Sequence, residues 1–378
     1  MLRVDFNVEI VNQTIKLYPD LWIELQKRFP KIEHWLKREE KPTLKQLGKL
    51  AHFLHIPLGY LLLDEVPTLH KIPIPHFRTK EEAPFQPSLE LIDTIKSVRK
   101  KQEWARDLLK EFGHVKLSFV GSLDINADIK EAAAKIRETL NLADNWTAEL
   151  HGRSTALNHL VKKAEGVGIF VIVNSIVDFN THRPLNVKEF RGFVLSDEYA
   201  PFIFINGKDA KSAQLFTLAH ELVHVWIGKS ASFDLREMMP AKDEIEQFCN
   251  SVAAEFLVPE HILRKQYAQY GVDYQALSRY FKVSELVIAR RLLDLELIQR
   301  NEFLDYYKEY ISREIQSRRV LGGDFYETAK YRISIRFARL IHAALLEGRI
   351  LYRDAYRVTG LYGKTFDEFF RRQVYSYV

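Results

Sequence analysis

Cysteine is almost absent from this chain of 378 residues, in which Cys249 stands alone. A single thiol excludes disulfides within the chain and zinc fingers built from cysteines, and it is typical of a reducing compartment. Long apolar runs are also missing, because IPLGYLLL and GIFVIV fall far short of the roughly 18–20 residues that span a membrane. The first residues lack the basic-then-apolar order of a signal peptide. We therefore expect a cytoplasmic protein that has no membrane segment.

Composition places the chain among ordinary globular proteins, with 47% hydrophobic and 28% charged residues. Charge is unevenly distributed, because residues 1–80 carry 13 Lys+Arg against 9 Asp+Glu, and residues 313–378 carry 13 against 7. The net charge of the whole chain is only +5, so the central part is acidic. Basic ends suit contact with nucleic acid, but solvated helix faces give the same counts, and both interpretations stay open.

The most informative segment is FTLAHELVHVWIG, residues 216–228, which holds His220, Glu221 and His224 in H-E-x-x-H spacing. On a helix, the two histidines project from one face and can reach a single ion, with the glutamate beside them. The surrounding residues are apolar nearly all round, and Gly228 predicts the end of the helix. Buried imidazoles and a buried carboxylate need partners, and a bound cation supplies one.

Catalytic zinc usually has three protein ligands and an open position for water, so this motif is one ligand short. On a helical wheel of residues 243–259, Glu246 lies at the edge of the inward stripe, whereas Glu244 and Glu255 point away. Glu246 is therefore the predicted third ligand, ahead of Glu244 and then Asp243. The alternative is that Glu246 is a rim carboxylate in a salt bridge.

The chemistry follows from these residue types. Zn²⁺ would polarise a scissile carbonyl and lower the pKa of its bound water, and Glu221 would accept a proton from the attacking water and pass it to the leaving amine. Glu221 itself is rotated away from the histidine face and is not expected to be a ligand. Asn250 lies one turn from Glu246 and would orient a ligand or the substrate, unless it is a surface amide.

Four segments are expected along the chain. Residues 1–68 read as a bundle of short helices, with a capping box at Thr43 and Gln46, and would be either a DNA-binding helix-turn-helix domain or a docking domain. Residues 69–150 read as a linker interrupted by prolines, at 71–79 and beyond, followed by a helical scaffold. Lys37, Arg38 and Lys45 are the candidate contacts of the first segment to nucleic acid or a partner.

Residues 151–300 read as the peptidase domain, in which a capped helix from Ser154 to Gly166 and three strands precede the motif helix. Residues 301–378 read as a basic helical region. Within it, three arginines at i, i+4 and i+7 would share one helix face and meet phosphate or an acidic partner, unless the face is only solvated; they are Arg332, Arg336 and Arg339. The predicted fold class is α+β, mostly helical, with a small sheet beside the motif helix.

Several blocks in the same order give the chain a resemblance to a known family. They are EKPTLKQLGKLAHFL, IPIPHFRT, FRGFVLSDEYAPFIFIN, FTLAHELVH, the E..CN..AAEFLVP pattern of Glu246–Pro259, VSELVIARRL and GGDFYETAKYRISIRFARLIHAALLEGRI. With these blocks the chain resembles the ImmA/IrrE family of zinc metallopeptidases fused to an XRE-type helix-turn-helix domain. The resemblance implies a zincin-like catalytic domain with zinc held by His220, His224 and Glu246, and Glu221 as the catalytic acid and base.

The resemblance also implies a biological role. The partner would be a protein substrate encoded nearby, an XRE-type repressor or an antitoxin, cleaved in stress response, mobile-element control or phage defence. The alternative is a DNA-binding transcriptional regulator or toxin–antitoxin component whose peptidase domain is sensory or inactive. The sequence leaves the oligomeric state open.

Overall fold

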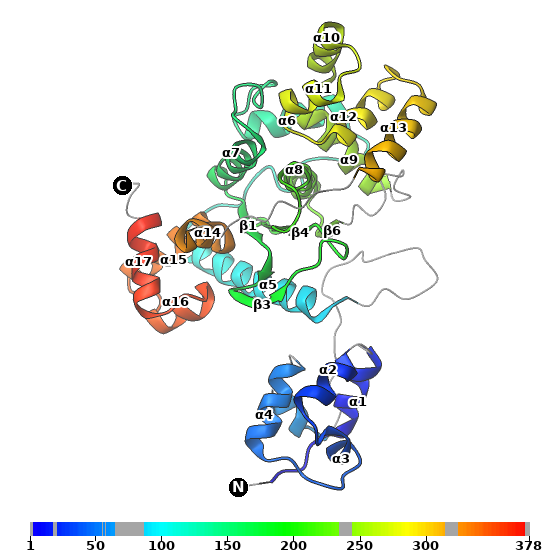
Figure 1. The fold of residues 1–378 in the computed structure, drawn as a ribbon. Coiled ribbons are helices and arrows are strands. Elements are labelled where there is room, and N and C mark those ends of the chain that lie inside the picture. The colour runs from blue at the N-terminus through cyan, green and yellow to red at the C-terminus, as the bar shows by residue number, and fades with distance from the viewer. Residues whose placement is uncertain are drawn as a thin grey trace. The chain divides into compact units, whose positions relative to one another are not determined.

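The computed structural model describes residues 3–17, 21–54, 56, 58–64, 87–233, 244–313 and 324–374. The fold is α+β and mostly helical, which confirms the predicted class. The chain divides into two compact units (Figure 1), the first formed by described residues up to Lys96 and the second by those from Ser97 onward. The expected linker at 71–79 and the candidate ligand Asp243 lie outside the described residues. The finer division of the chain into four segments stays a prediction.

The first unit is a bundle of short helices around its own apolar core. Thr43 and Gln46 form the predicted capping box, in which the Gln46 N–H donates to Thr43 Oγ1 over 3.3 Å and the Thr43 N–H donates to Gln46 Oε1 over 2.8 Å. Leu25, Trp35 and Leu50 are buried in the core. The elements are α1 (Val8–Leu17), α2 (Leu21–Arg28), α3 (Ile32–Leu36), α4 (Leu44–Phe53) and the 3-10 helix η1 (Leu58–Leu62).

The second unit is organised around a four-stranded mixed sheet in the order β1-β5-β4-β6. Strand β1 pairs parallel with β5, while β4 pairs antiparallel with both β5 and β6. The strands of VGIFVIVN and RGFVLSDEYAPFIFIN are those predicted, whereas the β2-β3 pair and β6 were not. The strands are β1 (Phe170–Asn174), β2 (Ile176–Val177), β3 (Asn180–Pro184), β4 (Gly192–Leu195), β5 (Phe202–Asn206) and β6 (Ala231–Phe233).

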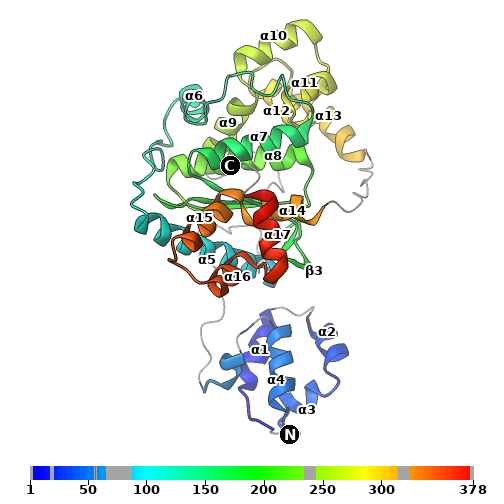
Figure 2. The same cartoon turned by 90° about the vertical axis from the view of Figure 1, so that its left-hand side faces the viewer.

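Helices cover both faces of this sheet, and Figure 2 shows α7 (Arg153–Gly166) and α8 (Lys211–Ile227) together on one of them. Val171, Val194 and Ile203 belong to the same buried cluster as these helices. The other face is aromatic, because Phe170 stacks on Phe202 with 4.5 Å between ring centroids and Phe337 meets both rings edge-on. The C-terminal helices therefore pack directly onto the sheet.

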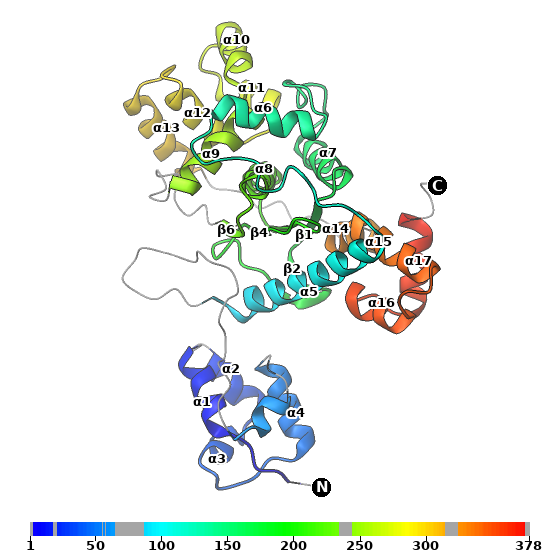
Figure 3. The same cartoon turned by 180° about the vertical axis from the view of Figure 1, so that it is seen from behind.

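The remaining elements of the second unit are helical, as predicted. They are α5 (Leu89–Glu111), which begins in the first unit, α6 (Ile129–Thr139), α9 (Glu244–Leu257), α10 (Glu260–Tyr270), α11 (Tyr274–Phe281), α12 (Glu285–Asp294), α13 (Arg300–Ser312), α14 (Phe325–Ile333), α15 (Ile335–Leu346), α16 (Tyr352–Thr359) and α17 (Gly363–Gln373). Helix α9 packs against both α6 and α8, and Figure 3 shows α6 beside α9. Helix α12, from the VSELVIARRL block, is buried in the same core and serves as scaffold.

Two local expectations are wrong. The helix at 153–166 begins one residue before Ser154, after Gly152, whose φ of 88° places it in the left-handed region, and no side chain caps it. The three arginines do not share one helix face, because Ser334, at φ 72°, ends α14 and caps α15. Arg332 is consequently on α14, whereas Arg336 and Arg339 are on α15.

The structure also bears on the membrane question. Across the described ranges, none of the helices combines the length and the apolar character that crossing a membrane requires.

Candidate metal centre

Helix α8 carries the motif and is buried along most of its length. It ends as predicted at Gly228, whose φ is 78° and whose N–H donates to the carbonyls of His224 and Val225. A Cβ at Gly228 would lie only 2.9 Å from the Cα of Gly121, so the position has no room for a side chain. His220 and His224 are one turn apart on this helix, and their exposed fractions are 0% and 1%.

Helices α8 and α9 bring three side chains to one point. The Nε2 atoms of His220 and His224 are 3.1 Å apart, and the Glu246 carboxylate lies 3.1 Å from the first and 3.3 Å from the second. Ligands of a tetrahedral zinc ion, each about 2.0–2.1 Å from the metal, are separated by about 3.3–3.4 Å. The spacing of these donor atoms therefore fits a zinc ion.

Hydrogen bonding around the centre also fits a cation. His220 Nδ1 lies 3.1 Å from Asn250 Oδ1, and in the tautomer that donates this bond, Nε2 turns its lone pair toward the carboxylate of Glu246. Within the described ranges, His224 Nδ1 and both carboxylate oxygens of Glu221 are buried and have no hydrogen-bond partner. The buried Glu221 carboxylate, and the histidine lone pairs that face Glu246, are costly unless a positive charge lies near them.

Burial and mutual charge shift the pKa values of the three groups. Burial lowers the pKa of His220 and so favours the neutral imidazole that can bind a metal. Burial opposes ionisation of Glu246, but while the two rings carry protons on Nε2, hydrogen bonds and charge from His220 and His224 outweigh it and lower the pKa of Glu246 well below its ordinary value. A cation bound in place of those protons would act on Glu246 in the same direction. Burial, followed by repulsion from Glu246, raises the pKa of Glu221 well above its ordinary value.

Cys249 is a second candidate for the third position. Its Sγ belongs with the histidine nitrogens to a group of donor atoms that all lie within 4.8 Å of one another, and the thiol is buried. We favour Glu246, because one of its oxygens lies 3.1 Å from His220 Nε2 and the other 3.3 Å from His224 Nε2, and because its lowered pKa keeps it ionised. Glu244 is exposed at the start of α9. Cys249, which lies one residue before Asn250, was not among the ligands predicted from the sequence.

Gly192 is a further residue that sequence reasoning missed. It lies on β4 against α8, where an added Cβ would be 2.6 Å from Thr217 Cγ2, 2.9 Å from the Phe204 carbonyl and 3.3 Å from Glu221 Oε1. The backbone of β4 therefore forms part of the wall that holds the Glu221 carboxylate. A glycine inside a strand pattern signals such a close approach, so RGFVL contained the clue.

Glu255 differs from its expected position. It is buried, and its carboxylate is paired with Arg291 of α12, whereas the helical wheel placed it away from the core. The pairing explains the difference, because a buried carboxylate is stable when an arginine compensates its charge.

The basic candidates belong to two different units of the chain. Lys37, Arg38 and Lys45 are exposed in the first unit. In the second unit, the Arg332 guanidinium lies over the Phe179 ring, and Arg336 donates to the Glu165 carbonyl over 3.1 Å. Within the second unit, the structure thus brings together His220, His224, Glu246, Glu221 and Asn250, and neither Arg332 nor Arg336 contacts this group.

Two segments of the chain match known protein families, and one of them contains the metal centre. Residues 333–372 match DUF8813, a domain of unknown function, and neither this match nor the one below reaches the first unit. No curated protein matches the chain. Residues 164–293, which include the whole of α8 and α9, match the family Peptidase_M78, described as the IrrE N-terminal-like domain. This part of the chain is therefore similar to the ImmA/IrrE peptidases, and the similarity supports a metallopeptidase-like function.

Proposed function

We propose that the protein is a zinc-dependent endopeptidase that cleaves a partner protein. One observation carries the proposal: donor atoms of His220, His224 and Glu246 converge within 3.3 Å, beside a buried Glu221 carboxylate. Three ligands from protein and one open position are the arrangement of catalytic zinc sites. Asn250 would hold His220 in the ligating tautomer.

The reaction assigned to these residues is hydrolysis of a peptide bond. A zinc ion held by the three ligands would polarise the carbonyl, activate water and favour the ionised form of Glu221. Glu221 accepts the proton of the attacking water and then delivers it to the leaving amine. The backbone of β4 at Gly192 lies close to the Glu221 carboxylate and limits where that carboxylate can move, since a Cβ added at Gly192 would be 3.3 Å from Glu221 Oε1.

The substrate is proposed from the resemblance and from the sheet. Strand β6 lies at the edge of the sheet and contacts α8, so an extended segment of a substrate could pair with it through backbone hydrogen bonds. The resemblance suggests an XRE-type repressor or an antitoxin encoded nearby. Such a substrate would link cleavage to stress response, mobile-element control or phage defence.

A second candidate is a DNA-binding regulator or toxin–antitoxin component with a sensory or inactive peptidase domain. The exposed Lys37, Arg38 and Lys45 of the first unit favour it. It predicts sequence-dependent binding to the promoter of its own operon, with affinity that falls steeply with salt. The test is titration of the promoter DNA with the wild type and with Lys37→Glu at two salt concentrations. A DNA-binding regulator should bind more weakly at high salt and as the variant, whereas a helical docking domain should not bind the DNA at all.

The test of the peptidase begins with metal content. Protein purified without chelator should hold one zinc per chain, and His220→Ala and Glu246→Ala should lose it. A repressor-like protein from a neighbouring gene is then incubated with the wild type, with Glu221→Gln and with Glu244→Gln. Cleavage should survive only in the wild type and in Glu244→Gln, whose exposed glutamate is the matched control. Full zinc retention by His220→Ala would refute the proposed centre.

A further inference from the structure

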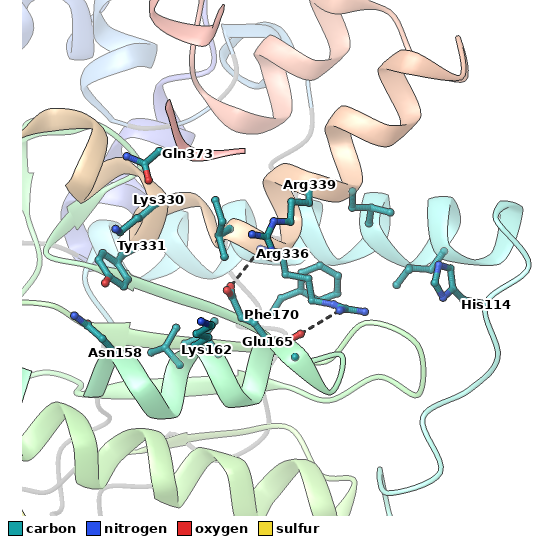
Figure 4. A pocket seen from close by; sticks show the side chains of 16 residues that line it. His114, Asn158, Lys162, Glu165, Phe170, Lys330, Tyr331, Arg336, Arg339 and Gln373 are labelled. Atoms are coloured by element: carbon teal, nitrogen blue, oxygen red, sulfur yellow. Dashed lines mark hydrogen bonds between the residues drawn. The ribbon is translucent and has the colours of Figure 1, made fainter. Parts of the chain in front are cut away.

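A cavity of about 850 Å³ lies in the second unit, away from the metal centre. Figure 4 shows side chains of α7 facing those of α14 and α15 across it. Its apolar lining includes Val161, Phe170, Ile335 and Leu340. This volume is within the roughly 300–1,000 Å³ that small-molecule sites occupy, and a mainly apolar lining with a few polar groups is usual for them.

The charged residues around this cavity are mostly cationic. Lys162 of α7, Lys330 of α14, and Arg336 and Arg339 of α15 line it, against the single carboxyl group of Glu165. That carboxyl is occupied within the protein, because the Ser334 hydroxyl and the Arg336 N–H donate to it. Lys330 is paired with Glu327, but Lys162, Arg336 and Arg339 still give the lining a positive charge.

Arg336 is held in place and still has a donor to offer. Its Nη1 donates to the Glu165 carbonyl over 3.1 Å, and its guanidinium carbon lies 5.3 Å from the centre of the Phe170 ring. Its Nε is buried and, within the part of the chain that the structure describes, has no hydrogen-bond partner. A buried guanidinium donor without a partner is costly, and an anionic group that reached this nitrogen from the cavity would satisfy it.

We propose that this cavity binds a nucleoside phosphate. The phosphate would lie among Arg336, Arg339 and Lys162, where guanidinium and ammonium groups favour phosphate oxygens. The base would lie on the apolar lining formed by the half-buried Ile335 and Leu340, and the Asn158 amide and the Tyr331 hydroxyl line the same cavity and can form hydrogen bonds. This number of polar side chains favours a nucleoside phosphate over a long-chain carboxylate, because a long-chain carboxylate would need one cation and an otherwise apolar channel.

The site joins two parts of the chain. Glu165 and Phe170 belong to the segment that matches the peptidase family, whereas Arg336 and Arg339 belong to the segment that matches DUF8813. Helix α7 also packs against the motif helix α8. A ligand that contacts both segments would stabilise their packing and raise the melting temperature of the protein.

The binding test uses the full chain and isothermal titration calorimetry with separate probes. These are AMP, GMP, CMP, UMP and ATP, with adenosine, inorganic phosphate and dodecanoate as comparisons. We expect at least one nucleotide to bind, with affinity falling as salt rises, and adenosine and phosphate to bind at least about tenfold more weakly. Zinc content and peptidase activity do not enter this measurement, so it can fail independently of the proposed function.

The charge variants are Lys162→Glu and Arg339→Glu, because both side chains are exposed and the fold should tolerate the change. Each should weaken nucleotide binding at least about tenfold, while Arg353→Glu, an exposed arginine of α16 that does not line the cavity, should leave it unchanged. Circular dichroism checks that each variant is folded. Absence of nucleotide binding up to about 1 mM, equal binding by all variants, or tighter binding of dodecanoate would overturn the proposal.

Discussion

Helix α9 carries a buried or half-buried carboxylate near each of its ends, and the two have different partners. Near the C-terminal end, Glu255 is paired with Arg291 from α12. Near the N-terminal end, Glu246 faces His220 and His224, and the pKa of His220 is lowered, which favours the neutral ring. The counter-charge of Glu255 is therefore an arginine of the same chain. Glu246 and the two histidines are instead arranged to bind a cation from outside the chain.

The largest expected effect is at the metal centre, where Glu221 of α8 lies beside the N-terminal end of α9. Glu221→Gln should lower the rate of substrate cleavage by about 10²–10⁴-fold, because the amide cannot accept the proton of the attacking water. Zinc content, measured by mass spectrometry, should stay at the wild-type level, because Glu221 is not a ligand. Loss of zinc together with activity would show that Glu221 has a structural role instead.

The other end of α9 should respond in stability rather than in catalysis. Arg291→Ala leaves the Glu255 carboxylate buried without a counter-charge and should lower the free energy of unfolding by about 3–5 kcal/mol. Arg290→Ala is the matched control, since the pair that this neighbouring arginine forms with Asp294 is partly exposed, and its loss should cost less than about 1 kcal/mol. Urea unfolding measures the free energy of unfolding of both variants. Equal losses in the two variants would contradict a special role for the buried pair of Glu255 and Arg291.

Glu165 extends the comparison to a carboxyl group with no full ion pair. Burial raises the pKa of Glu165 from 4.5 to about 7, although hydrogen bonds from Ser334 and Arg336 oppose the rise. The folded state then binds the proton more tightly than the unfolded state, so this contribution to stability is complete below about pH 4.5 and is lost as the pH rises through 7. At about 1.4 kcal/mol for each pKa unit, it amounts to no more than a few kcal/mol.

The test of this pH dependence is Glu165→Gln, which cannot ionise. Between pH 5 and pH 8, the wild type should lose more stability than the variant does, as measured by thermal unfolding at each pH. Identical pH profiles of the two proteins would contradict the raised pKa of Glu165.

The smallest expected effect concerns the wall of the metal centre. Gly192→Ala would press on Thr217 and on the Phe204 carbonyl and should cost about 1–3 kcal/mol of stability. Because Glu221 Oε1 is also within 3.3 Å of the new methyl group, kcat should fall while KM changes little. Gly166→Ala, at the end of α7, has nothing within 4 Å of its added Cβ and serves as the control.

Prediction from the sequence succeeded where the signal was local. The H-E-x-x-H spacing located the pair of histidines, and the wheel of residues 243–259 picked Glu246, which the structure brings within 3.3 Å of both. The capping box at Thr43 and the helix end at Gly228 are also local patterns, and both are confirmed. The roles of these residues in binding zinc remain predictions until metal content is measured.

Prediction failed where a distant residue or an unusual backbone angle decided the outcome. Ser334 adopts φ 72° and ends α14, which separates Arg332 from Arg336 and Arg339. The spacing of residues around Ser334 gave no sign that a helix ends there. Glu255 was expected to point away from the core, but Arg291, distant in sequence, provides a buried partner. The close approach of Gly192 to Glu221 likewise joins a strand to a helix that follows it.

The amino-acid order by itself determined the helices, the central strands and the side chains that share a helix face, because these depend on residues a few positions apart. Tertiary structure decided which polar groups meet across elements: Glu246 with the two histidines, Glu255 with Arg291, and the cations of α7, α14 and α15 around one cavity. These contacts depend on how α8, α9 and the C-terminal helices pack. A buried charge is stable only beside an opposite charge or a hydrogen-bond partner, and that partner can come from a distant part of the sequence.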